Sequence, residues 1–259
     1  MDDSLNDFRV FEFGPGPSAQ RRSVYFKGEG PGVLIMHELP GLSPQCLDLG
    51  RRIAANGFTV FLPLFFGRAG EHSNWNVRFC IAGTFSLWAS SIDEPLLNWL
   101  RALAREIHGR CGGKGIAAIG LCLTGGFALA LLVEPVLMAA VTSEPARPAA
   151  PVPGYAARID LSAKQWQEAC NRARRDKIPT FGTRFTCDNK SPAQRFETIA
   201  HGLEGNFRCF PIDSSPGNSY NIPASAHSVL TYHFVDEPEH PTRKVFDRLI
   251  EFLHERMTP

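Results

Sequence analysis

The chain has 259 residues, of which 44% are hydrophobic and 20% are charged, a composition typical of a globular protein and not of a disordered one. Its 27 basic and 26 acidic residues leave a formal net charge of +1, which gives no reason to expect nucleic acid or an anionic membrane as a partner. The acidic start has no apolar segment typical of a secretory signal, and the seven cysteines contain no Cys-x-x-Cys pair. We therefore expect a cytoplasmic protein with reduced thiols, no disulfide framework and no zinc cluster.

Short apolar runs alternate with amphipathic segments along most of the chain, and we interpret them as buried strands and helices. In the first part of the chain we expect a strand at 23–26 on a sheet edge, strands at 32–36 and 58–62 flanking a helix that starts at Ser43-Pro44, and a helix from Pro95. The middle part should contain a strand at 116–119, a helix at 127–133, a strand at 136–141 and a helix at 163–175. A strand at 181–187, a helix capped by Ser191-Pro192, a strand at 207–212 and a final helix from Pro241 should follow. Residues 64–90 show no clear periodicity and are expected to form a loop or short helices over a site.

Strands that alternate with helices predict an α/β fold, with a mostly parallel central sheet covered by helices on both faces. We find no internal repeat and no break in composition, so we expect a single domain over residues 1–259. Residues 115–133 carry no charge and are long enough for a membrane helix, but the glycines inside the segment and Glu134 after it favour a strand, a turn and a helix. In such sheets ligands bind beyond the carboxyl ends of the strands, so residues that follow strands are the candidates for chemistry.

The segment Gly120-Leu121-Cys122-Leu123-Thr124-Gly125-Gly126 joins the strand expected at 116–119 to the helix expected at 127–133. A strand, the pattern Gly-x-nucleophile-x-small and a helix together form a nucleophile elbow. There the sulfur stands clear of the backbone at a helix N-terminus, which favours the thiolate. Thr124 is larger than the glycine usual at its position, and the chain contains no Gly-x-Ser-x-Gly. We predict that Cys122 is the nucleophile; the alternative is an inert buried cysteine.

A cysteine hydrolase also needs an acid that orients its base, and the usual chain order is nucleophile, acid, histidine. Asp188 directly follows the strand expected at 181–187 and is our candidate acid. Asp213, after the last strand, is the rival, whereas Asp176 lies before its strand and thus at the wrong end of the sheet.

The candidate base is His227, which lies in a loop after the last strand. His233 and His240 compete with it but lie further toward the final helix. The remaining histidines considered fall in or near helix ends, where we expect surface residues: His108, His201 and His254.

Together these motifs resemble the dienelactone hydrolase family of α/β-hydrolases, from about residue 33 to about residue 253. The family pattern Gly-x-Cys-x-Gly-Gly corresponds to the elbow at Cys122, with one additional residue, a threonine. The resemblance assigns the acid to Asp188 and the base to His227. It also matches the family's early glutamate to Glu38, in His37-Glu38-Leu39-Pro40-Gly41.

The resemblance implies that the backbone N–H groups of Leu39 and Leu123 form an oxyanion hole. A carboxylate beside a thiol disfavours the thiolate and accepts the S–H proton, so Glu38 is expected to keep Cys122 neutral until substrate displaces it. The alternative is that Glu38 is a solvated loop residue. The implied reaction is hydrolysis of a small ester or lactone through a thioester, with no cofactor and no metal.

The family also uses arginines to hold a substrate carboxylate. Arg78 matches one of them, but residues 228–232 contain no arginine and Thr231 occupies the corresponding place. This departure argues against dienelactone itself as the substrate. Two alternative functions remain open: a catalytically silent binding or regulatory protein of the same fold, and a redox protein, which would need a resolving cysteine near Cys122.

Overall fold

The computed structural model describes residues 5–16, 20–71, 94–146, 154–159 and 161–258. The elements are β1 (Arg9–Phe13), β2 (Arg22–Lys27), β3 (Gly32–Met36), α1 (Pro44–Ala55), β4 (Thr59–Pro63), α3 (Glu94–Cys111), β5 (Ile116–Leu121), η2 (Cys122–Thr124), α4 (Gly125–Ala130), η3 (Leu131–Val133), β6 (Leu137–Ser143), η4 (Tyr155–Ala157), α5 (Ala163–Arg175), β7 (Thr180–Phe185), α6 (Ala193–Leu203), β8 (Phe207–Ile212) and α7 (Pro241–Met257).

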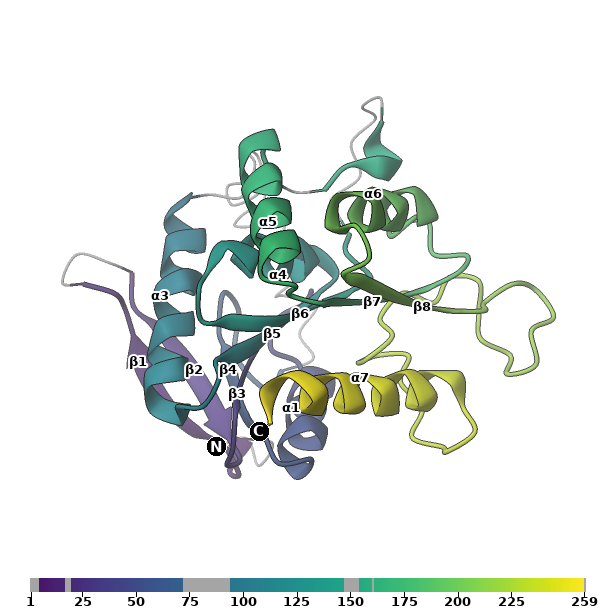
Figure 1. Ribbon diagram of the computed structural model, residues 1–259. Helices are drawn as coiled ribbons and strands as arrows, with labels where there is room; N and C mark the ends of the chain where they lie inside the picture. The colour runs from purple at the N-terminus through teal and green to yellow at the C-terminus, as the bar shows by residue number, and fades with distance from the viewer. Residues whose placement is uncertain (1–4, 17–19, 72–93, 147–153, 160, 259) are drawn as a thin grey trace.

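The described strands form one eight-stranded sheet in the order β1-β2-β4-β3-β5-β6-β7-β8 (Figure 1). The pairs β1–β2 and β2–β4 are antiparallel and all other neighbours are parallel, so the predicted mostly parallel sheet is confirmed. The prediction that residues 23–26 lie at a sheet edge is wrong. The edge strand is β1, which pairs with β2 and which no sequence pattern predicted, because its mostly exposed residues leave only a weak apolar pattern.

Helices cover both faces of this sheet, as predicted. Helices α3, α4, α5 and α6 pack on one face, whereas α1 and α7 pack on the other (Figure 1). Successive residues of β3 alternate between the two cores: Leu34 and Met36 face the first set of helices, and Val33 and Ile35 face the second. This is the period of two that a strand imposes on its side chains. Both faces are thus filled with apolar side chains, and the ends of the strands remain available for polar groups.

Several local expectations are tested by the element boundaries. Residues 115–133 form β5, η2, α4 and η3, so the strand–turn–helix interpretation is confirmed. The helices among the described residues are all too short or too polar for a membrane span. Ser43 caps α1 by accepting a hydrogen bond from the Cys46 N–H at 3.3 Å, as expected. Ser191 does not cap α6; its hydroxyl instead donates to the Pro145 carbonyl at 3.0 Å, and Pro192 is the cap residue.

Candidate active site

Four neighbouring parallel strands are each followed by a side chain that can take part in catalysis. Glu38 follows β3, Cys122 follows β5, Glu144 follows β6 and Asp188 lies in the turn after β7. The carboxyl ends of parallel neighbours meet at one edge of a sheet, so these four groups converge. His227 joins them from the long loop between β8 and α7. All five side chains are buried, with exposed fractions of 9% or less.

The turn that carries Cys122 is tightly constrained. Cys122 has a φ of +49°, a left-handed backbone conformation that a non-glycine residue adopts only when its surroundings enforce it. A Cβ atom on Gly120 would lie 2.2 Å from the Thr124 carbonyl oxygen, so only glycine fits there. The Thr124 hydroxyl accepts a hydrogen bond from the Leu121 N–H at 2.9 Å and lies 2.7 Å from the Met36 carbonyl, which can accept its proton. The threonine thus ties the elbow to the end of β3, a role that the sequence did not suggest.

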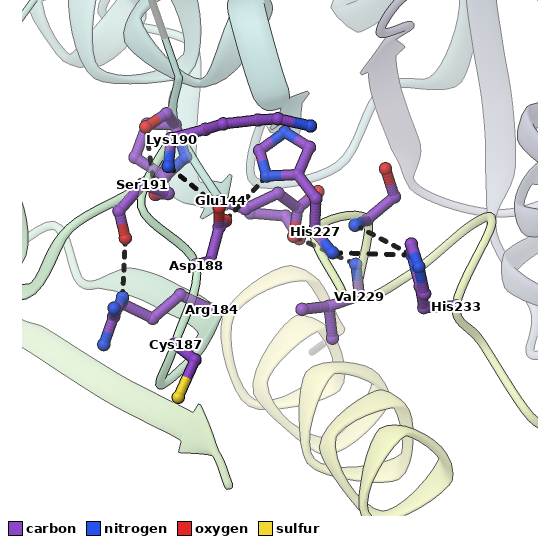
Figure 2. A network of polar contacts seen from close by, with 12 residues as sticks. Glu144, Arg184, Cys187, Asp188, Lys190, Ser191, His227, Val229 and His233 are labelled. Carbon is purple, nitrogen blue, oxygen red and sulfur yellow. Dashed lines mark hydrogen bonds and ion pairs between the residues drawn. The ribbon is translucent and has the colours of Figure 1, made fainter. Parts of the chain in front are cut away.

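His227 and Asp188 face each other across the site (Figure 2). The Nδ1 atom of His227 lies 2.6 Å from Oδ2 of Asp188, and the second carboxylate oxygen accepts a hydrogen bond from the Lys190 N–H at 3.0 Å. Because a carboxylate accepts hydrogen bonds, Nδ1 carries the imidazole proton and Nε2 presents its lone pair. Nε2 is buried and has no hydrogen-bond partner among the described residues. The Asp188–His227 pair therefore presents a free basic nitrogen inside the site.

The alternative candidates for the acid and the base make contacts outside the catalytic pair. Asp213 is exposed and accepts a hydrogen bond from the Ser215 N–H at 2.9 Å. His240 caps α7, where its ring accepts from the Thr242 N–H at 3.3 Å. His233 is a neighbour of the site and accepts from the Ser228 N–H at 3.3 Å, so it supports the backbone of the His227 loop. Its burial lowers the pKa of the ring.

Glu38 is a buried residue of the site and not a solvated loop residue. Its carboxylate accepts hydrogen bonds from the Ser228 hydroxyl, at 2.6 Å, and from the Thr231 hydroxyl. A carboxylate oxygen of Glu38, the Cys122 sulfur and a ring nitrogen of His227 all lie within 4.8 Å of one another. Burial raises the pKa of the Glu38 carboxyl, and the two hydroxyls oppose this by stabilising its ionised form. Thr231, which stands where the family resemblance implies an arginine, is thus a neutral partner of this carboxylate.

The Cys122 thiol is held in its neutral form. Burial raises its pKa well above the ordinary value, and the negative charges of Glu38 and Glu144 raise it further. The Leu123 N–H opposes these effects through a hydrogen bond to the sulfur. The resting site therefore contains an SH group, and attack on a substrate requires transfer of its proton.

Glu144 is a site residue that the sequence analysis missed. Its Oε2 atom accepts hydrogen bonds from the Ser143 hydroxyl at 2.5 Å and from the Val229 N–H at 3.1 Å (Figure 2), whereas Oε1 has no described partner. Burial, and then the charge of Glu38, raise the pKa of its carboxyl well above the ordinary value. It thus joins the end of β6 to the loop that carries His227. A polar residue directly after a buried strand is a candidate for the site, but the strand was expected to end at 141, two residues short of its actual end, so Glu144 did not stand out.

The remaining predicted residues are only partly described. Cys122, Leu123 and Ala146 form one small apolar cluster, and Leu39 packs against it, so both residues assigned to the oxyanion hole lie near the candidate nucleophile. Leu123 is the second residue of η2, and the amides in the first turn of a helix lack acceptors within the helix. Arg78 lies outside the described residues, as does most of the segment 64–90.

Comparisons with known proteins agree with this architecture. A family model described as the dienelactone hydrolase family matches residues 22–255. A solved putative dienelactone hydrolase from Klebsiella pneumoniae is similar, with 18% identity, a TM-score of 0.61 and coverage of 96% of this chain and 100% of the other. A dienelactone hydrolase from Anabaena variabilis has 13% identity, a TM-score of 0.61 and coverage of 97% and 100%. A dienelactone hydrolase-like promiscuous phosphotriesterase from metagenomic libraries has 18% identity, a TM-score of 0.60 and coverage of 96% and 98%. The search of curated proteins gives no match.

Proposed function

Given that the chain belongs to the dienelactone hydrolase family, we propose that it hydrolyses small esters or lactones with Cys122 as nucleophile, His227 as base and Asp188 as the acid that orients the base. The observation that carries the proposal is the cluster in which the Cys122 sulfur, a Glu38 oxygen and a His227 nitrogen lie within 4.8 Å of one another, with Asp188 bound to the far side of the imidazole at 2.6 Å. This is the relation of nucleophile, base and orienting acid that acyl transfer requires.

The reaction begins from a neutral thiol. His227 Nε2 accepts the S–H proton, and the Cys122 thiolate attacks the carbonyl carbon of the substrate. Negative charge develops on the carbonyl oxygen, which the N–H groups of Leu39 and Leu123 stabilise; one such donor contributes about 3 kcal/mol to catalysis. The imidazolium then protonates the leaving oxygen as the C–O bond breaks, which leaves a thioester on Cys122. His227 next takes a proton from water, and the hydroxide attacks the thioester carbonyl. The C–S bond breaks, the carboxylic acid leaves, and the imidazolium returns its proton to the sulfur.

Glu38 controls when the thiolate forms. An ionised Glu38 next to the sulfur repels a second negative charge, so the thiol stays protonated while the site is empty. Substrate that enters the cluster screens or displaces this carboxylate and lowers the free energy of the thiolate. A thiol protected in this way resists oxidation and alkylation between turnovers, because only the thiolate reacts.

The surroundings of Glu38 favour uncharged substrates. The family resemblance implies an arginine shortly after the histidine, which holds a substrate carboxylate. Here the described partners of Glu38 are the hydroxyls of Ser228 and Thr231, and Glu144 adds another buried carboxyl near the thiol. Buried carboxyl groups disfavour an additional negative charge. The proposed substrates are therefore small esters or lactones without a carboxylate beside the scissile bond.

A panel of small esters, thioesters and lactones tests the proposal on wild type, Cys122→Ala and the matched control Cys209→Ala, which removes an exposed thiol on β8. We expect hydrolysis by wild type and Cys209→Ala and a loss of at least about 10³-fold in Cys122→Ala, as when other covalent nucleophiles are removed. Equal rates in wild type and Cys122→Ala would refute the assignment. No hydrolysis by wild type across the panel would favour the alternative of a silent binding protein.

A further inference from the structure

We propose that Glu38, Cys122 and His227 also form a reversible zinc site, and that Zn²⁺ bound there switches the enzyme off. The inhibition rests on the proposed function, whereas the metal binding rests on the geometry of the three side chains alone. The ligands come from three separate parts of the chain, so no ligand spacing in the sequence indicates this site.

The donor atoms match zinc in type and in spacing. Thiolate, imidazole and carboxylate are the ligands that Zn²⁺ takes in proteins, whereas Mg²⁺ and Ca²⁺ prefer oxygen alone. Zinc–ligand bonds of about 2.0–2.3 Å in a tetrahedron put neighbouring donor atoms about 3.5 Å apart. The three donor atoms here already lie within 4.8 Å of one another. The distance between any two donor atoms therefore exceeds the zinc spacing by at most about 1.3 Å.

The groups behind the ligands are also those of a metal site. Asp188 holds Nδ1 of His227 at 2.6 Å and leaves Nε2 buried without a hydrogen-bond partner among the described residues. A carboxylate that orients a histidine toward an ion is the usual arrangement behind zinc. Ser228 and Thr231 fix Glu38, and each carboxylate oxygen keeps a second lone pair for a metal. The imidazole thus has a buried nitrogen free to bind an ion, and the neighbouring carboxylate is held by two hydroxyls.

Charge and proton balance favour the bound ion. As the Zn–S bond forms, the Cys122 proton leaves to water, so the thiolate and the Glu38 carboxylate together neutralise the two positive charges. Three protein ligands leave a fourth position open to water. The bound ion occupies both the sulfur lone pair needed for attack and the Nε2 lone pair needed for proton transfer. Zinc and substrate therefore exclude each other.

Cobalt serves as the spectroscopic probe, because Co²⁺ accepts the same ligands and a thiolate–Co²⁺ bond absorbs in the near ultraviolet. Metal-free protein is titrated with CoCl₂ and then with ZnCl₂, and ester hydrolysis is measured at each zinc concentration, with MgCl₂ as the control metal. The ligand variants are Cys122→Ala and His227→Ala, and Asp188→Asn tests the group behind the histidine. The matched controls are Cys209→Ala and His201→Gln, which change an exposed thiol and an exposed imidazole.

We expect one Co²⁺ per chain, a thiolate band that zinc abolishes, and inhibition by zinc that a chelator reverses and magnesium does not reproduce. Cys122→Ala should lose the band, His227→Ala should weaken binding at least 10-fold and Asp188→Asn about 10–100-fold, while both controls bind as wild type does. A band that persists in Cys122→Ala, or no band in wild type, would overturn the metal site. An active enzyme that saturating zinc does not inhibit would refute the switch and leave the hydrolase intact. Metal binding by an inactive protein would uphold the site and refute the proposed hydrolysis.

Discussion

The substitution Glu38→Gln removes one negative charge beside the Cys122 sulfur and keeps the shape of the side chain. The amide oxygen can still accept a hydrogen bond from Ser228 or Thr231, so the loop around it should hold its place. Because the Glu38 charge raises the pKa of the Cys122 thiol, the substitution should lower that pKa and increase the thiolate fraction at neutral pH. We expect the variant to be alkylated faster than wild type.

The size of the effect follows from the geometry. Two unit charges at the 4.8 Å limit of the cluster interact by about 3.5 kcal/mol at an effective dielectric constant of about 20, which corresponds to about 2.5 pKa units. Because burial also raises the pKa of the Glu38 carboxyl and so opposes its ionisation, this Coulomb value overstates the effect, and we expect a fall of about 1–2 units in the thiol pKa. That fall gives about 10- to 100-fold more thiolate. A thiolate of lower pKa is also a weaker nucleophile, by about 3- to 10-fold here, so the net acceleration is about 3- to 10-fold.

The assay is the rate of iodoacetamide modification of the Cys122 peptide, followed by mass spectrometry from about pH 6 to pH 10. Both proteins carry Cys187→Ser and Cys209→Ser, which remove exposed thiols that would compete for reagent. Glu168→Gln, an exposed carboxyl on α5, is the matched control and should alkylate as wild type does. An unchanged alkylation profile in Glu38→Gln would refute the electrostatic account of the resting thiol.

Further predictions concern the elbow and the second buried glutamate. Thr124→Val removes the hydroxyl that ties the elbow to β3 and should lower the free energy of unfolding by about 1–3 kcal/mol in denaturant titrations. The control Thr198→Val, at a partly exposed position where the hydroxyl bonds only within its own helix, should change it by less than about 0.5 kcal/mol, and equal effects would contradict the tether. Gly120→Ala places a Cβ 2.2 Å from a backbone carbonyl oxygen and should lower the free energy of unfolding by at least about 1–3 kcal/mol. The control Gly109→Ala places a Cβ where no atom lies within 4 Å and should leave stability unchanged or increase it. A neutral Gly120→Ala would show that the turn can relax. The folded-state pKa of Glu144 is raised above its unfolded value, so wild-type stability should fall as pH rises from about 4.5 toward that raised pKa. Glu144→Gln should therefore raise Tm more at about pH 8 than at about pH 4. Calorimetry that finds the same Tm difference at both pH values would argue against a buried titrating carboxyl.

Most of the fold follows from local patterns in the sequence. The buried parallel strands are short apolar runs because both faces of each strand are covered, and the periodicity of α5 and α7 matches their buried faces. Edge structure is harder to predict, because β1 is paired on one side only and its residues are mostly exposed. The ends of strands are also hard to predict to within a residue or two. The strand expected at 136–141 extends to Ser143, so Glu144 was not recognised as the residue that directly follows it.

Site residues could be predicted from the sequence where the order of the strands alone brings them together. Glu38, Cys122 and Asp188 follow β3, β5 and β7, parallel strands within one stretch of the sheet, so their convergence is a consequence of strand order. The contacts of Ser228 and Thr231 with Glu38 are different, because they join residues far apart in the chain through a loop without regular structure. The tether made by Thr124 was also hidden, since it depends on the Met36 carbonyl of another strand. Such contacts require the folded geometry.

The most direct measurement of the central claim is the mass of the covalent intermediate. An ester of slow turnover is mixed with the enzyme, the reaction is stopped with acid, and the digested protein is searched for the acyl group. The account predicts an acyl thioester on the peptide that contains Cys122, absent from Cys122→Ala and accumulating further in His227→Ala if that variant still acylates, because its deacylation lacks the base. An acyl group on a different residue, or full turnover by Cys122→Ala, would contradict the claim that this thiol performs the chemistry.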